Sequence, residues 1–110
     1  ELDPAPMWEA LLRDLRGGVA DARIAARFHR GLARAVAGVA RRLAAEQGIT
    51  TVALSGGVFQ NRTLFEAVSS RLTASGLEVL SHERVPSNDG GLALGQAAVA
   101  AAQRLSGRRR

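Results

Sequence analysis

The apolar residues between positions 24 and 43 recur at intervals of three and four, which is the spacing of one face of an α-helix. This stripe consists of Ile24, Phe28, Leu32, Val36, Val39 and Leu43. Asp21 precedes the stripe as a candidate N-cap, and Gly48 follows it as a C-terminal stop. The pattern predicts a long helix between these two residues, with most of its arginines on a solvated face.

Three further segments carry helical patterns. The first, residues 6–16, follows Asp3 and Pro4, which suit a cap and a first helical turn. Its core side is predicted to hold Met7, Leu11, Leu12 and Leu15, with Trp8 near one edge. The segment 62–74 has Leu64, Phe65, Val68 and Leu72 as its expected buried set. The last predicted helix, residues 90–105, is rich in alanine and glycine.

Two short apolar runs, residues 50–54 and 77–80, are predicted to be β-strands. With a helix between them, they indicate two parallel strands joined by a crossover. The chain is therefore expected to be an α/β protein, helix-rich with a small parallel sheet. A two-stranded sheet is marginal alone and has two unpaired edges, so we expect self-association or pairing with further chain.

Small residues mark two places where close packing is expected. Ala33, Ala37 and Gly38 would let another element approach the long helix. Gly91, Gly95 and Ala98 form a small face on the last helix. That face predicts tight packing on the sheet or on a second helix.

The loop at residues 55–61, Ser-Gly-Gly-Val-Phe-Gln-Asn, joins the first strand to a helix. Strand, glycine turn and helix start is an arrangement that α/β proteins use to hold phosphate or nucleotide. Gly56 and Gly57 have no Cβ, so a ligand can come close, and Asn61 is a good N-cap. A tight turn without a ligand is the alternative interpretation.

A second loop, Val-Pro-Ser-Asn-Asp-Gly-Gly at residues 85–91, follows the second strand. Loops at the carboxyl ends of parallel strands share the ligand-binding edge of a sheet, so both loops are expected there. Asn88 and Asp89 can each cap the last helix. Asp89 also offers hard oxygen ligands to a metal ion or a metal-bridged phosphate, and the cap and ligand interpretations both stay open.

These two loops, in this order and spacing, resemble the C-terminal end of the HypF family of carbamoyltransferases. The upstream segment Ala-Arg-Phe-His-Arg-Gly-Leu-Ala at residues 26–33 resembles that family too. The resemblance implies that residues 1–106 are the C-terminal portion of a Kae/TsaD-like domain. Such a portion is a fragment of an actin-like ATPase, or ribonuclease H-like, domain.

The resemblance also implies a reaction and a set of contacts. HypF-like proteins use carbamoyl phosphate and ATP with Mg to form a carbamoyl-adenylate. They then pass the carbamoyl group to the C-terminal cysteine of the partner HypE, in nickel–iron hydrogenase maturation. Here Ser55, Gly56, Gly57 and Asn61 match the nucleotide-binding loop, and Asp89 matches an aspartate that binds a divalent transition metal, Fe or Zn.

The two histidines of the chain depart from that family pattern. The other metal ligands of the family are a His-x-x-x-His pair on an earlier helix, and this sequence has no such pair. His29 is interpreted as a residue of a packing helix, and His82 as a loop residue. The chain alone is therefore expected to be inactive, with the remaining metal ligands outside it.

Composition restricts the class of protein further. The chain has 110 residues, no cysteine and a formal charge of +5 with no lysine. No apolar run approaches the roughly 20 residues of a membrane span, and a cytoplasmic protein is expected. Residues 107–110 are interpreted as a disordered basic tail. With few aromatic residues, the composition does not favour nucleic-acid binding.

Two other functions compete with the HypF interpretation. One is a TsaD-like subunit that modifies tRNA, although Phe59 and Gln60 favour the hydrogenase branch. The other is a non-catalytic interaction module, for which the small-residue helices and missing ligands argue. Partners expected from the first interpretation are a HypE-like acceptor, carbamoyl phosphate and the rest of the same polypeptide.

Overall fold

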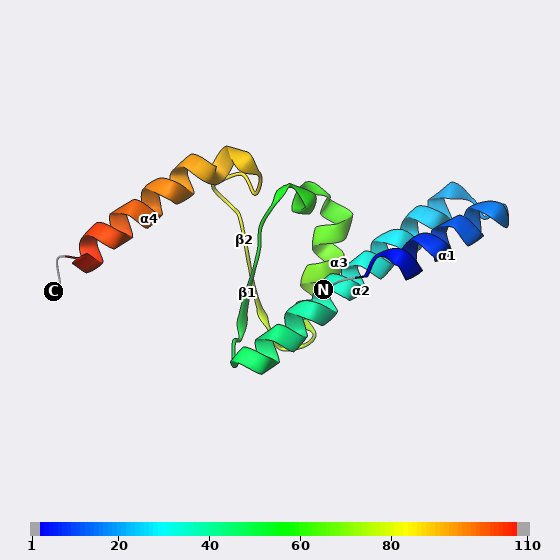
Figure 1. Cartoon of the computed structure of the whole chain (residues 1–110), viewed down its shortest axis with the longest axis horizontal. Helices are drawn as coiled ribbons and strands as arrows, with labels where there is room; N and C mark the ends of the chain where they lie inside the picture. The colour runs from blue at the N-terminus through cyan, green and yellow to red at the C-terminus, as the bar shows by residue number, and fades with distance from the viewer. Residues whose placement is uncertain (1–2, 108–110) are drawn as a thin grey trace.

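The computed structural model describes residues 3–107, which form an elongated arrangement of helices around a short sheet (Figure 1). Its α-helices are α1 (Ala5–Arg16), α2 (Asp21–Gln47), α3 (Arg62–Thr73) and α4 (Leu92–Gly107). Its strands are β1 (Thr51–Leu54) and β2 (Glu78–Ser81). Single 3-10 turns, η1 (Gly57–Gln60) and η2 (Asp89–Gly91), follow the first strand and precede α4. The predicted order of elements is confirmed.

The sheet has two parallel strands, with Thr51 opposite Glu78 and Leu54 opposite Ser81. Each strand begins one residue later than the apolar pattern predicted. The side chain of Thr51 donates a hydrogen bond to Glu78 at 3.1 Å, across the start of the pair. The expected α/β class, helix-rich with a small parallel sheet, is therefore confirmed.

The hydrophobic core lies where α2 and α3 pack together beside β1. Its buried members come from these three elements and are Ala33, Ala37, Leu54, Leu64, Val68 and Leu72. Leu64, Val68 and Leu72 confirm the expected buried set of α3, while Phe65 is half-buried. Burial of large aliphatic side chains contributes about 1.5–3 kcal/mol each, so this cluster provides much of the stability.

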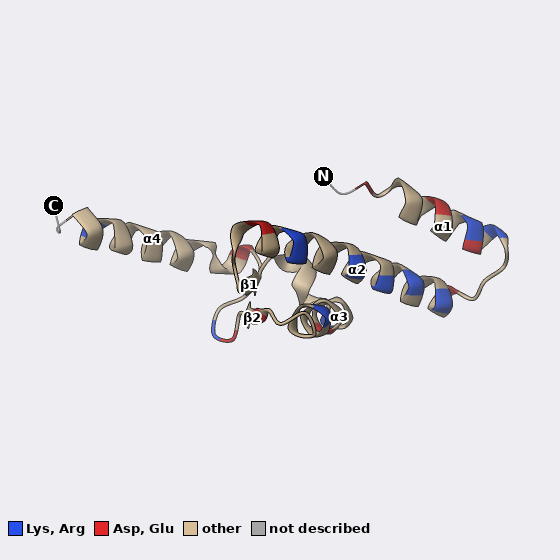
Figure 2. Ribbon diagram, turned by 90° about the horizontal axis from the view of Figure 1, so that it is seen from below, with Lys and Arg blue, Asp and Glu red and all other residues tan. Residues whose placement is uncertain are grey.

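The core face of α2 differs from the predicted stripe. Its buried residues are Ile24 and the alanines Ala33, Ala37 and Ala44, while Leu43 is 50% exposed. The alanines let α3 approach closely, as the small residues predicted, whereas Gly38 is exposed. The larger side chains of the stripe flank this contact and stay partly accessible. Figure 2 shows the basic residues of α2 in a row along the helix, and its arginines are exposed as predicted.

Helix α1 lies along the N-terminal half of α2. Trp8 and Phe28 stack across the contact in a tilted arrangement, with ring centroids 6.1 Å apart. None of the residues of α1 is fully buried, and Leu12 and Leu15 are 47% and 51% exposed. The prediction that these two leucines face the core was therefore wrong for the residues that the structure describes.

The ends of the helices agree only in part with the predicted caps. Asp21 is the first residue of α2 rather than its cap, which is Ala20, although Gly48 ends the helix with the expected left-handed φ of 65°. Asp3 accepts a hydrogen bond from the backbone N–H of Ala5 at 2.9 Å, while Pro4 is the N-cap of α1.

Helix α4 extends away from the rest of the structure (Figure 1). None of its residues is buried, so the predicted tight packing of Gly95 and Ala98 is wrong within residues 3–107. Gly91, just before the helix, is the exception, since a Cβ there would lie 2.7 Å from the carbonyl oxygen of Pro86. The helix starts at Leu92 and includes Gly107, the first residue of the expected tail, and residues 108–110 lie outside the described part.

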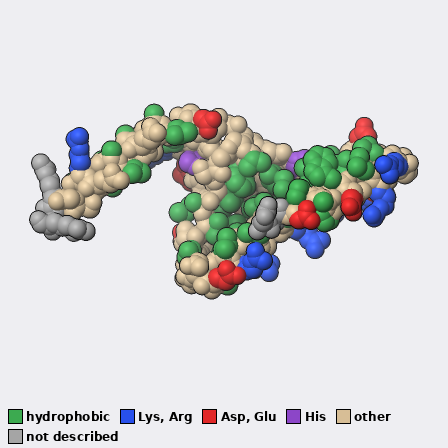
Figure 3. Space-filling view, in the orientation of Figure 1, with side chains coloured by type: hydrophobic (Ala, Val, Ile, Leu, Met, Phe, Trp, Pro, Cys, Tyr) green, Lys and Arg blue, Asp and Glu red, His purple; other side chains and the backbone are tan. Residues whose placement is uncertain are grey.

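The extended shape leaves much apolar surface accessible. The radius of gyration is 18.0 Å, against about 13 Å for a compact domain of this length. The accessible area is 8527 Å², against about 5,800 Å² for a compact monomer of this mass. In Figure 3, hydrophobic side chains are exposed along α4 and gather where α1 meets α2. Within residues 3–107, no helix combines the length and apolarity that a membrane crossing requires.

Candidate functional site

The two glycine-containing loops meet at the carboxyl edge of the sheet. Because β1 and β2 are parallel, the loops that follow them leave the sheet on the same side. The backbone N–H of Gly56 donates a hydrogen bond of 2.7 Å to the carbonyl oxygen of Ser87. The prediction that loops 55–61 and 85–91 share one edge is confirmed, and this bond holds them at a fixed separation.

The two adjacent glycines serve different purposes. Gly56 has φ 105° and ψ 154°, a conformation open almost exclusively to glycine, while space around its missing Cβ is free. Gly57 has no such dihedral, and a Cβ there would lie 3.9 Å from the Cβ of Asn88, an ordinary contact. A Cβ at either position would therefore not clash with the turn. The backbone requires glycine at Gly56, and the turn itself does not require it at Gly57.

The hydroxyl of Ser55 lies at the end of β1 and is paired with a histidine from the other strand. His82 Nε2 is 2.9 Å from Ser55 Oγ. The sequence indicated only a loop position for His82, which is exposed and directly follows β2. The contact across the edge of the sheet could not be read from sequence, because 27 residues separate the two side chains.

Asn61 closes the first loop and starts α3. Its Oδ1 accepts a hydrogen bond of 3.1 Å from the backbone N–H of Leu64, which confirms the predicted N-cap. Its Nδ2 lies 2.9 Å from Nε2 of His29, on α2. His29 is partly buried, as expected for a packing helix, but this polar contact with the loop was missed.

Asp89 lies in η2, beside a residue that does the capping. Asn88 Oδ1 accepts a 3.0 Å hydrogen bond from the backbone N–H of Gly90, so Asn88 is the cap. Within residues 3–107, the exposed carboxylate of Asp89 makes no hydrogen bond or ion pair with another side chain. The interpretation of Asp89 as merely a cap is wrong, and its carboxylate is free for a ligand.

Metal binding needs more ligands than residues 3–107 bring together. No group of three histidine, cysteine, aspartate or glutamate side chains close enough to hold a metal occurs among residues 3–107. His29 and His82 already contact Asn61 and Ser55. Within the described residues, these side chains do not form a metal site by themselves.

A hollow of about 280 Å³ opens beside the first loop. Apolar side chains and a polar rim line it, from Leu54, Phe59, Gln60, Arg62, Phe65, Ser81, His82 and Ser87. A hydrogen bond from Arg62 to Glu66 of 2.6 Å, together with the charge of that carboxylate, raises the pKa of Arg62. Arg62 thus stays charged at the rim, paired with the carboxylate of Glu66.

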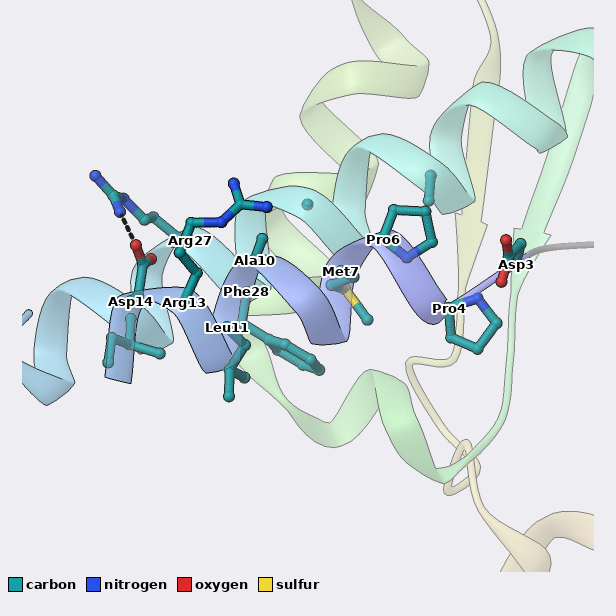
Figure 4. Close-up of a pocket in the computed structure, with 13 residues that line it drawn as sticks. Asp3, Pro4, Pro6, Met7, Ala10, Leu11, Arg13, Asp14, Arg27 and Phe28 are labelled. Atoms are coloured by element: carbon teal, nitrogen blue, oxygen red, sulfur yellow. Dashed lines mark hydrogen bonds and ion pairs between the residues drawn. The ribbon is translucent and has the colours of Figure 1, made fainter. Parts of the chain in front are cut away.

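A larger hollow of about 560 Å³ lies between α1 and α2, away from these loops (Figure 4). Met7, Leu11 and Phe28 contribute to its mainly apolar lining, and an ion pair between Asp14 and Arg27, 2.6 Å long, crosses one end. None of the site residues expected from the sequence lines it. The candidate chemistry therefore belongs to the smaller hollow and the loops beside it.

Comparison with known protein families gives a match over most of the chain. Residues 1–96 match the family described as "Carbamoyltransferase, Kae1-like Domain, second subdomain". Both glycine-containing loops lie inside this range.

Individual relatives agree with that match. The chain is 44% identical over 102 residues to the carbamoyltransferase HypF of Rhodobacter capsulatus, covering 93% of this chain and 13% of the relative. It is 50% identical over 82 residues to a carbamoyltransferase HypF homolog of Cupriavidus necator, covering 74% of this chain and 21% of that protein. The chain thus spans a small part of the length of these relatives.

Solved structures show the same arrangement of elements. A full-length HypF in its phosphate- and nucleotide-bound form superposes with a TM-score of 0.86 at 40% identity, covering 89% of this chain and 13% of that one. The HypF of T. kodakarensis superposes with a TM-score of 0.81 at 30% identity, covering 90% and 13%.

Proposed function

The chain belongs to the HypF family of carbamoyltransferases, as a match to the second subdomain of the Kae1-like domain, and we propose that its loop 55–61 binds nucleotide within a full-length carbamoyltransferase. The resemblance identified from the two loops is thereby confirmed. The observation that supports the proposal most directly is the hydrogen bond from Gly56 to Ser87, which fixes both loops at one edge of the sheet.

The proposed reaction is that of the family. Carbamoyl phosphate and ATP with Mg form a carbamoyl-adenylate, and the carbamoyl group then passes to the C-terminal cysteine of a HypE-like acceptor. This reaction serves the maturation of nickel–iron hydrogenases in the cytoplasm. The chain contributes one wall of the nucleotide site, and the rest of the polypeptide contributes the other.

The geometry of the first loop suits a phosphorylated ligand. The Cα of Gly57 is bare and exposed, so an anionic group can approach the backbone there. The N-terminus of α3 lies at Asn61 and carries a partial positive charge. Arg62 lies beside it, with its side chain 88% exposed and paired with Glu66. Ser55 and Asn61 supply the polar side chains of the same loop.

Two alternatives were open from sequence. The relatives described above carry HypF names, and no structural observation favours the tRNA-modifying branch. An interaction role is compatible with the proposal, because α4 presents apolar side chains with no neighbour among residues 3–107. We propose that α4 packs on the remaining domains of the polypeptide, and that the chain alone self-associates and is not an enzyme.

Gly57→Ala tests nucleotide binding with little disturbance of the turn. A methyl group fits the turn at this position, so a loss of affinity reports on the ligand. We expect ATP affinity of the full-length protein to fall by about tenfold or more, equivalent to about 1.4 kcal/mol. Calorimetry measures the affinity, and carbamoyl-phosphate-dependent release of AMP measures turnover.

Gly38→Ala is the matched control, because a Cβ there meets nothing within 4 Å and the position is exposed on α2. It is expected to leave ATP affinity unchanged. Equal ATP affinity in the parent and the Gly57→Ala protein would exclude close approach of the nucleotide at this glycine.

Asp89→Asn tests the second loop. The side chain keeps its size and loses its charge, and it makes no hydrogen bond in the described residues that the change would break. We expect carbamoyl transfer and bound transition metal to be lost together in the full-length protein, with thermal unfolding unchanged. Normal metal content in a folded, fully active Asp89→Asn protein would remove Asp89 from the site.

A further inference from the structure

We propose that His29, on α2, is a positioning residue that fixes the side-chain amide of Asn61 in the orientation needed for ligand binding. This inference rests on the proposed function, because it takes Asn61 as part of the nucleotide site. Its structural basis is a continuous set of hydrogen bonds from α2 to the start of α3, in which every donor and acceptor can be assigned.

The assignment starts at the backbone of α2. His29 Nδ1 lies 2.8 Å from the carbonyl oxygen of Ala25, one helical turn earlier. A carbonyl oxygen can only accept, so Nδ1 must carry the proton. In the neutral ring, Nε2 then has a lone pair and can only accept. An imidazolium would instead place an Nε2–H donor against the amide group of Asn61.

The assignment ends at the backbone of α3. The N–H of Leu64 can only donate, and it bonds the side chain of Asn61 at 3.1 Å. The atom facing Leu64 must therefore be Oδ1, which leaves the NH₂ group facing His29. Nδ2 donates to Nε2 of His29 at 2.9 Å. The two backbone groups thus fix both the tautomer of His29 and the orientation of Asn61.

This arrangement decides what Asn61 can offer a ligand. One amide proton bonds His29 and the other is free to donate from an exposed side chain. The atom that it binds must be a hydrogen-bond acceptor, such as an oxygen of a phosphate or of a ribose. Reversal of the amide would break the cap of α3 and the bond to His29 together, so the donor is held in place.

The surroundings of His29 favour a positioning role over simple packing. The ring of Phe28 lies edge-on to it, with centroids 6.1 Å apart and planes at 78°. The neighbouring arginines bond elsewhere, Arg30 to the carbonyl oxygen of Ala26 and Arg27 to Asp14. His29 is thus the member of this turn whose polar atoms link α2 to a loop 32 residues away. An apolar side chain could fill the same space but could not hold the amide.

Three substitutions of His29 separate positioning from packing. In His29→Gln, the side-chain oxygen can take the place of Nε2 and accept from Asn61. In His29→Asn, the shorter amide can take the place of Nδ1 but cannot reach Asn61. His29→Leu keeps apolar contacts and makes neither bond. We expect ATP affinity of the full-length protein to stay within about twofold of the parent for Gln and to fall by about tenfold for Asn and Leu.

Arg30→Gln is the control on the same turn of α2, since its side chain bonds only its own helix in the described structure. It is expected to bind ATP as the parent does. Thermal unfolding of each variant identifies any that fails to fold, and the Gln and Asn variants, both polar, then provide the comparison.

A second measurement reads the contact without any ligand. The 110-residue chain has two histidines, so nitrogen NMR of the labelled rings gives two sets of signals, and His29→Gln assigns them. We expect the Nδ1–H tautomer for His29 in the parent. In Asn61→Asp, the carboxylate can still cap α3 but has no N–H to donate to Nε2, so the Nε2 signal of His29 is expected to shift.

The NMR and ATP-affinity measurements test different parts of the proposal. An Nε2–H tautomer in the parent chain, or a ring unaffected by Asn61→Asp, would overturn the contact. ATP affinity equal to the parent in folded His29→Leu, or lost equally in His29→Gln, would overturn the positioning role. If the full-length parent binds no ATP, the proposed function fails and the ligand role of Asn61 fails with it, while the NMR result still decides whether His29 holds the amide.

Discussion

Helices α3 and α4 differ in how deeply their residues are buried in this structure. Helix α3 buries Leu64, Val68 and Leu72 against α2 and the sheet, whereas α4 buries none of its residues. Yet α4 is the more apolar of the two. Burial therefore follows from the placement of large side chains and from the presence of a neighbour, and not from overall apolarity.

The placement of the large residues explains the difference. On α3 the three buried residues are spaced by four positions and fall on one stripe. On α4, Leu92 and Val99 lie on one side, while Leu94 and Leu105 lie on the opposite side, given about 100° of rotation per residue. A helix that is apolar all round is typical of the interior of a larger protein. This agrees with our proposal that α4 packs on further domains.

The largest effect that separates the two helices is expected from Leu72→Ala. Leu72 is fully buried, so removing its side chain should lower the free energy of unfolding by about 2–5 kcal/mol. Leu105→Ala on α4, where the side chain is 67% exposed, should change it by less than about 0.5 kcal/mol. Urea unfolding of the chain followed by circular dichroism gives both values. Similar losses in a chain shown by light scattering to be monomeric would show that α4 is buried in the chain by itself, contrary to the structure.

Two glycines, Gly91 just before α4 and Gly95 near its start, are expected to differ less in their effect on stability. A Cβ at Gly91 would lie 2.7 Å from the oxygen of Pro86 and 2.9 Å from Cγ1 of Val85, so Gly91→Ala must displace loop 85–91. We expect a loss of about 1–3 kcal/mol. Gly95→Ala meets nothing within 4 Å and should stabilise the helix by up to about 1 kcal/mol.

The same unfolding experiment measures both glycine variants. Stabilisation by Gly91→Ala would mean that loop 85–91 does not pack on the start of α4 as described. Such a result would also change the position assigned to Asp89, which lies in that loop.

The order of the elements could be predicted from the sequence because each has a local cause. Periodicity identified α2 and α3, and the cap at Asn61 and the stop at Gly48 are encoded within a few residues of each helix end. The shared edge of the two loops followed from parallel pairing. These features depend on neighbours in sequence or on a general rule of sheet topology.

Contacts between distant residues could not be predicted in this way. His29 and Asn61 are 32 residues apart, and His82 and Ser55 are 27 apart, with no periodic pattern joining either pair. Ala33 and Ala37 are more deeply buried than the larger apolar residues of α2, and this difference depends on how closely α3 approaches. The exposure of α4 depends on which other segments surround it, and the residue pattern of the helix does not specify those segments.

The smallest effect concerns α1, which is intermediate between the packed α3 and the free α4. Its ion pair from Asp14 to Arg27 is 2.6 Å long, with side chains 18% and 51% exposed. A pair this accessible contributes about 0–1 kcal/mol, because solvent and salt screen it. We expect Arg27→Gln to lower the free energy of unfolding within that range, and the loss to shrink in 1 M salt, where the Debye length is about 3 Å.

Arg41→Gln, on the same exposed face of α2 and without an ion pair in the described residues, is the control. A loss above about 2 kcal/mol that persists in salt would show instead that the pair is buried and that α1 is docked as firmly as α3.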